Sequence, residues 1–89
     1  MNKVFLAGTV KDRAEVRYTP KGERIAMFPL WVDDGAFFIE VLYKMPEGIR
    51  DCAGKAGGRV MVSGMLTKTG ETANRLFRLK ANKIFWMEE

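Results

Sequence analysis

Hydrophobic and polar residues alternate along five short stretches of this chain. The stretches are residues 3–10, 24–32, 36–43, 59–68 and 75–87, and segments rich in glycine, aspartate or threonine separate several of them. Alternation at every second position is typical of a β-strand that turns one face toward a core. The pattern therefore predicts five strands and, over residues 1–89, a single all-β domain.

Residues 45–58 break the alternation and follow a helical period. Apolar residues recur there at spacings of three and four, at Ile49, Cys52, Ala53 and Ala56. Pro46 suits the first turn of a helix, and Gly57-Gly58 suits its end. We therefore expect one short helix between the third and fourth strands. Three strands, a helix and two strands are the order of the OB-fold, a five-stranded Greek-key barrel that binds oligonucleotides across its second and third strands.

Residues 15–23 contain a further strand end and a turn. Residues 15–18 alternate charged residues with apolar or aromatic ones, as expected for a half-exposed strand end. Thr19-Pro20-Lys21-Gly22 predicts a turn, because proline presets φ at the second position and glycine tolerates positive φ.

The alternation also predicts which side chains face the barrel interior. The second strand is expected to bury Ala26, Phe28, Leu30 and Val32, the fourth Val60, Val62, Gly64 and Leu66, and the fifth Phe77, Leu79 and Ala81. A tight turn of Asp33, Asp34 and Gly35 leads into the third strand.

In that third strand we expect Phe38, Glu40 and Leu42 to face inward, with Phe37 and Tyr43 on the opposite, solvent-facing side. Glu40 stands alone on an otherwise apolar inward face. Either it pairs with a basic residue at a subunit interface, or the strand is displaced by one residue.

The charge balance indicates the kind of partner. Fifteen basic residues against eleven acidic ones give a net charge of +4, which on a small chain favours a polyanion such as nucleic acid. A soluble protein with a modest excess of lysine is the alternative. No hydrophobic run approaches the roughly 20 residues that span a membrane, and the N-terminus leads directly into a strand rather than a signal peptide. A cytoplasmic protein is expected.

The residue types argue against catalysis and against a metal. Cys52 is the only cysteine and there is no histidine. A disulfide or a structural zinc site within one chain is therefore excluded, and the commonest general base is missing. Asp33, Asp34 and Glu40 are the acidic residues that an enzyme would use, but the first two form an ordinary turn. We expect no enzyme, no cofactor and no metal.

Five sequence blocks resemble bacterial single-stranded DNA-binding proteins. They are residues 2–8, 17–22, 26–30, 60–66 and 81–84, in the order of that family and over nearly the whole chain. The resemblance implies an OB-fold that binds single-stranded DNA without sequence preference, in replication, recombination or repair. It also implies a homodimer or homotetramer, and the first strand, apolar on both faces, agrees with an assembly. RNA is a possible second ligand, since stacking does not distinguish the sugar.

Two departures from that family favour a second hypothesis. The loop after the second strand is short, and the chain stops at Glu88-Glu89 without the family's acidic tail. Residues 8–10 and 44–46 are similar to primosomal replication protein N, a tailless relative. The alternative function is therefore a component of a replication-restart complex that binds DNA and protein partners. The predicted helix favours the main family instead.

Candidate DNA-binding residues follow from the chemistry of single strands, which need stacking aromatics and phosphate-binding cations. An ungapped alignment from residue 37 to residue 64 puts Phe37 and Tyr43 at two stacking positions of the family. Trp31 is a third candidate, with an oligomer interface as its alternative role. The candidate phosphate-binding residues are Arg17, Lys44, Lys55, Arg59, Lys68, Arg78 and Lys80. Any one of these could equally be a solvated surface charge.

Overall fold

The computed structural model describes residues 1–45, 57–68 and 77–87. These residues form six strands: β1 (Val4–Val10), β2 (Glu15–Tyr18), β3 (Arg24–Val32), β4 (Phe37–Lys44), β5 (Arg59–Lys68) and β6 (Phe77–Met87). No helix occurs in these ranges, and so none that could cross a membrane. The helix predicted within residues 45–58 falls largely on residues 46–56, which lie outside the described residues.

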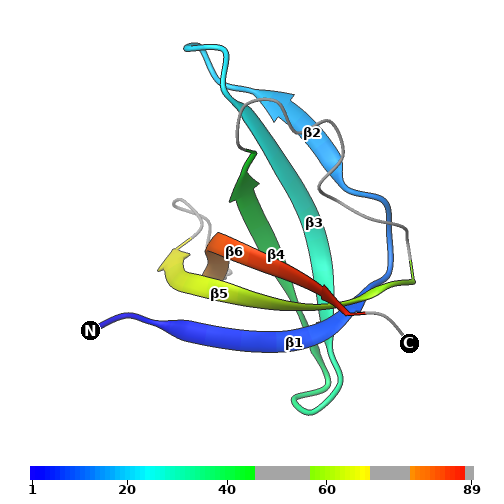
Figure 1. Cartoon of the computed structure of the whole chain (residues 1–89). Coiled ribbons are helices and arrows are strands. Elements are labelled where there is room, and N and C mark those ends of the chain that lie inside the picture. The colour runs from blue at the N-terminus through cyan, green and yellow to red at the C-terminus, as the bar shows by residue number, and fades with distance from the viewer. Residues whose placement is uncertain (46–56, 69–76, 88–89) are drawn as a thin grey trace.

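Five of the strands close into a barrel. The hydrogen-bonded order is β1–β5–β6–β4–β3, and β3 pairs back to β1 at Thr9–Trp31 and Val10–Leu30. Every pairing is antiparallel except β4 with β6, which run parallel. In Figure 1, β1, β5 and β6 run across β3 and β4, and β2 adds to the part of β3 that extends beyond the barrel. The predicted all-β OB-fold barrel is confirmed in these residues.

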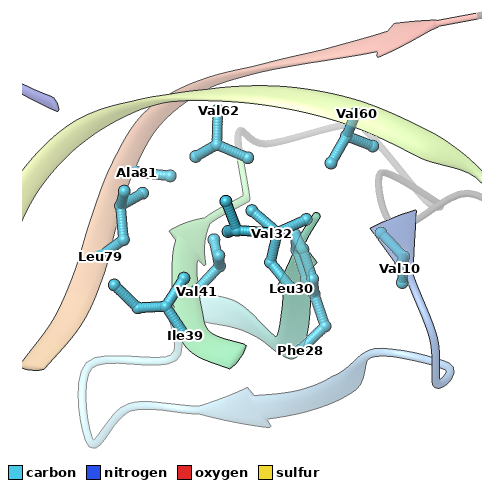
Figure 2. Close-up of a cluster of buried hydrophobic side chains, with 10 residues drawn as sticks. All are labelled: Val10, Phe28, Leu30, Val32, Ile39, Val41, Val60, Val62, Leu79 and Ala81. Carbon is cyan, nitrogen blue, oxygen red and sulfur yellow. The ribbon is translucent and has the colours of Figure 1, made fainter. Parts of the chain in front are cut away.

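The interior of the barrel is filled by side chains from all five closing strands. Figure 2 shows the cluster: Val10, Phe28, Leu30, Val32, Ile39, Val41, Val60, Val62, Leu79 and Ala81, each at most 9% exposed. The inward residues predicted for the second and fourth strands of the sequence pattern are confirmed in β3 and β5, with Leu66 only partly buried. This apolar burial is the main term that holds the barrel together.

The chain reversal between β2 and β3 takes the predicted form. The Gly22 N–H donates to the Thr19 carbonyl at 2.8 Å, and Gly22 has φ of +85°. The Thr19 hydroxyl also accepts the Glu23 N–H at 3.1 Å. The Thr19 side chain and Gly22 therefore both stabilise this turn, at the position that the sequence indicated.

The turn between β3 and β4 is one residue longer than predicted. It comprises Asp33 to Ala36, closed by the Ala36 N–H donating to the Asp33 carbonyl at 3.2 Å. Val32 therefore pairs with Phe37 rather than with Ala36. Directly paired residues of two antiparallel strands lie on the same face, so every β4 side chain lies on the face opposite to the one predicted.

The prediction for the two faces of β4 was accordingly wrong. Ile39 and Val41 are buried at 9% and 0% exposure, whereas Phe38 is 58% exposed and Glu40 is half-buried. Phe77, predicted as core, is also exposed, at 49%, because it begins β6 at the end of the barrel. Of the three phenylalanines predicted to be core, only Phe28 is buried.

A bulge in β6 changes which of its side chains point outward. Ser63 pairs with Lys83 and Gly64 with Ala81, which leaves Asn82 as an extra residue. The Ser63 hydroxyl donates to Asn82 Oδ1 at 2.9 Å and holds the bulge. A bulge shifts the inward–outward alternation by one residue. Arg78 and Lys80 point outward before it, and Phe85 and Met87 point outward after it.

Candidate nucleic-acid interface

The outward side chains of β3, β4 and the first half of β6 form one continuous surface, here called the aromatic face. The registers place Trp31 opposite Phe38, Met27 opposite Leu42, and Glu40 opposite both Pro29 and Arg78. The aromatic face comprises Ile25, Met27, Pro29, Trp31, Phe38, Glu40, Leu42, Lys44, Arg78 and Lys80. Because β2 lies outside the barrel, β3 and β4 are the second and third strands of the barrel. The aromatic face therefore corresponds to the surface across which OB-folds bind oligonucleotides.

Trp31 and Phe38 form an aromatic pair on this face. Their ring centroids are 4.8 Å apart and their planes meet at 54°. Phe38 is 58% exposed and Trp31 is partly exposed, so the pair presents ring surface to solvent. Exposed rings on a sheet surface are what stacking of nucleobases requires.

Cationic side chains lie on the aromatic face and beside it. Lys44 and Lys80 are exposed and Arg78 is half-buried. Arg17 lies on β2, opposite Ile25, and continues the face sideways. These four residues are the predicted phosphate-binding candidates that the fold brings to one surface.

Three of these cations have an acidic partner. The Arg78 guanidinium lies 2.5 Å from the Glu40 carboxylate, in an orientation that makes an ion pair rather than a well-aligned hydrogen bond. Lys44 pairs with Glu23, and Arg17 lies 3.5 Å from Glu15. Lys80 has no ion pair with any residue that the structure describes. Glu40, unexplained by the sequence, is thus an outward residue bound to a cation of the neighbouring strand.

The remaining predicted cations differ in position, and of the two that the structure describes only Arg59 borders the aromatic face, near Trp31. Arg59 is opposite Thr9, which in turn pairs with Trp31, and its guanidinium is 3.7 Å from Asp33. Lys68 ends β5 opposite Phe77, at the end of the barrel. Lys55 lies outside the described residues.

The two aromatic residues that the sequence favoured are not on the aromatic face. Tyr43 is partly buried and packs against the core. Phe37 lies on the same inward side of β4, but at its first residue, and is 41% exposed at the barrel end. Sequence reasoning missed Phe38, which takes the exposed position. With the length of the β3–β4 turn known, the pairing of β4 with β3 would have placed Phe38 opposite Trp31, on the outward side.

No metal-binding cluster occurs among residues 1–45, 57–68 and 77–87. No group of three or more Cys, Asp or Glu side chains converges there. Asp33 and Asp34 lie in the β3–β4 turn, and Glu40 is engaged by Arg78. The described surface therefore offers ring faces and cations to a ligand, and no acidic centre.

The closed barrel and its exposed sheet surface define an OB-fold domain, and solved structures of that class resemble it closely. The single-stranded DNA binding protein from Thermus aquaticus superimposes with a TM-score of 0.81, at 23% identity, over 100% of this chain and 41% of that one. A deletion mutant of the same protein gives 0.80, at 24% identity, over 100% of this chain and 42% of that one. This chain thus spans about two fifths of the length of those proteins.

A domain of a second kind of protein is similar to this chain over nearly its whole length. The N-terminal domain of PriB protein from Thermoanaerobacter tencongensis, described as dimeric, gives a TM-score of 0.75 at 22% identity, over 99% of this chain and 98% of that one. No protein-family model and no curated protein sequence matches the chain. The resemblance to single-stranded DNA-binding proteins and their tailless relative is therefore confirmed at the level of the fold.

Proposed function

We propose that this chain binds single-stranded DNA without sequence preference, across the aromatic face. The observation that carries the proposal is the exposed Trp31–Phe38 pair on the β3–β4 surface of an OB-fold. The structural similarity to a single-stranded DNA binding protein supports it. Replication, recombination or repair in the cytoplasm is the setting that such an activity serves.

In the proposed complex the aromatic rings stack on the bases, and the cationic side chains neutralise the phosphates. Bases stack on Phe38 and on the exposed part of the Trp31 ring, and every base offers a π-face, so the contact tolerates any sequence. Lys80, Lys44, Arg78 and Arg17 then neutralise the phosphates of the same strand. Tyr43 has no direct part in this arrangement, because it packs against the core.

Fluorescence titration with oligo(dT) tests this function. Trp31→Ala and Phe38→Ala should each weaken binding by about 1–3 kcal/mol, the usual value of one stacked base. Trp86→Ala is the matched control, since Trp86 is 38% exposed but lies opposite Val60, away from the aromatic face. Equal affinity of all three variants and the parent chain would remove the aromatic face as the binding surface.

The second candidate function is a PriB-like component of a replication-restart complex. A specific observation favours it: the similarity covers 98% of the PriB domain but 41% of the single-stranded DNA binding protein. The chain also has an apolar outer surface on β1, β5 and the end of β6. Phe5 is 62% exposed, and Met61, Phe85 and Met87 are each at least 38% exposed. Ala7, Met61 and Phe85 lie side by side in register. We call this surface the β1–β5–β6 face and propose that it pairs two copies of the chain.

The two functions differ in how strongly DNA is bound and what else is bound. Tight binding of oligo(dT) favours the first, and weak binding together with capture of a restart protein favours the second. RNA is a further ligand under either function, since stacking on aromatic rings does not distinguish the sugar.

A further inference from the structure

The barrel opens at one end into an apolar pocket of about 350 Å³. Its lining includes the rings of Phe37, Phe38 and Phe77 and the aliphatic side chains of Val4, Leu6 and Leu66. Phe37 begins β4 and Phe77 begins β6, so both rings stand where the core ends. The volume is at the lower end of what small-ligand pockets have.

The exposure of these rings is not explained by packing. Phe37 is 41% exposed and Phe77 is 49% exposed, although both lie on the inward side of their strands. Exposed aromatic surface around a concave apolar pocket is unfavourable in water and marks a place where a ligand can bind. Aromatic rings supply stacking area at little conformational cost.

The pocket is continuous with the aromatic face. Phe38 belongs to both, since it lines the pocket and also pairs with Trp31 at 4.8 Å between ring centroids. Lys68, exposed and opposite Phe77, provides a cation at the same end of the barrel. A strand that stacks on Phe38 therefore passes the opening of the pocket with a cation nearby for its phosphates.

We propose that one nucleobase of the bound strand leaves the stack and inserts into this pocket against Phe37 and Phe77. The inference rests on the proposed function, because the base arrives as part of the bound single strand. A nucleobase fits the lining because its two faces are apolar. Its polar edge stays toward the opening, since burying that edge among apolar side chains would leave its hydrogen bonds unmade.

The experiment combines oligo(dT) titration with acrylamide quenching of fluorescence. A fluorescent purine analogue is placed at each position of the oligomer in turn. On the parent chain, one position should be shielded from acrylamide. Phe77→Leu keeps the site apolar but removes the ring, and should weaken binding by roughly five-fold to a hundredfold and abolish the shielding. Trp86→Leu is the matched control, because Trp86 lies on the same strand, is 38% exposed and belongs to neither of the two named faces.

A second variant tests the pocket without removing a ring. Val4→Phe fills the cavity and leaves the aromatic face unchanged, so it should give the same loss of shielding, with thermal unfolding confirming that both variants are folded. If the parent chain binds oligo(dT) and both variants bind equally well, the pocket is overturned while the proposed function stands. If the parent chain does not bind at all, the proposed function fails, and base insertion fails with it.

Discussion

Gly64 is a residue at which the barrel tolerates little change. A Cβ added there would lie 2.1 Å from the Lys80 carbonyl oxygen of the neighbouring strand. Backbone atoms on the far side of a ladder cannot move aside as a flexible side chain could. The absence of a side chain at residue 64 is therefore a condition for pairing β5 with β6 at the bulge.

Gly64→Ala should lower the free energy of unfolding by about 1–3 kcal/mol or more, the usual cost of forcing atoms into a packed site. Urea denaturation measures the change. Met65→Ala is the control, because the Met65 side chain is 43% exposed and its truncation should cost about 0.5 kcal/mol or less. Similar midpoints for the two variants would mean that β5 and β6 separate easily at this point.

At the scale of elements, the β3–β4 turn decides which side chains of β4 lie on the aromatic face. Ala36 adopts a φ of +53°, a region that non-glycine residues occupy at a cost of about 1–3 kcal/mol. That extra residue gives the turn four positions and puts Phe38 outside and Val41 inside.

Ala36→Gly should therefore stabilise the chain by about 1 kcal/mol, because glycine removes the strain but adds some entropy to the unfolded state. The thermal unfolding midpoint checks the sign. Ala7→Gly, the same replacement inside β1, should instead destabilise by about 0.5–1 kcal/mol. A lower midpoint for Ala36→Gly would contradict the positive φ at this position.

The same turn shows how far the sequence could predict the structure. The strand boundaries of β3 and β5 and the inward residues of both follow from alternation and hold in the fold. β4 is apolar at both phases, with Phe37 and Ile39 on one side and Phe38 and Leu42 on the other, so alternation cannot choose between them. Only the length of the preceding turn decides which side of β4 faces inward. Residue 36 is an alanine rather than a glycine, so the sequence does not indicate its positive φ.

The candidate site was predicted in part for the same reason. Arg78 and Lys80 were correctly expected to point outward, because the charge pattern of β6 has only one plausible phase. The exposed position of Phe38 was not predicted, since Phe37 and Phe38 are adjacent and of one type. Long-range contacts such as Arg78 with Glu40 are set by the parallel pairing of β4 and β6, which local patterns do not encode.

At the scale of the whole molecule, two outer surfaces of the barrel differ in chemistry. The aromatic face combines rings with cations, whereas the β1–β5–β6 face exposes mainly Phe5, Met61, Phe85 and Met87. Contiguous apolar surface of this kind marks a protein–protein contact. A pair of chains joined there would keep both aromatic faces open.

Phe5→Glu and Phe85→Glu should convert the proposed dimer into a monomer, because association would bury an unpaired charge among apolar side chains. Sedimentation velocity at micromolar concentration measures the change in mass. Tyr18→Glu, at a residue of β2 that is 70% exposed, should leave the assembly intact. A parent chain that sediments as a monomer would contradict the proposed contact.

The acidic partners of the cations have a consequence for how DNA would be held. Of the six described candidate cations, four are paired with a carboxylate: Arg17, Lys44, Arg59 and Arg78. A DNA phosphate must displace those carboxylates, so each carboxylate competes with the DNA for its cation. Exposed ion pairs of this type are worth little, about 0–1 kcal/mol, so the exchange is feasible.

Glu40→Gln should accordingly tighten binding of oligo(dT) and steepen the log–log dependence of affinity on salt by about 0.7, the value of one further phosphate contact to a single strand. Asp12→Asn changes the net charge equally, at a residue with no ion pair to the described part of the chain, and should leave the slope unaltered. A surface whose cations are already paired with carboxylates would hold a single strand more loosely, and release it faster, than one with unpaired cations.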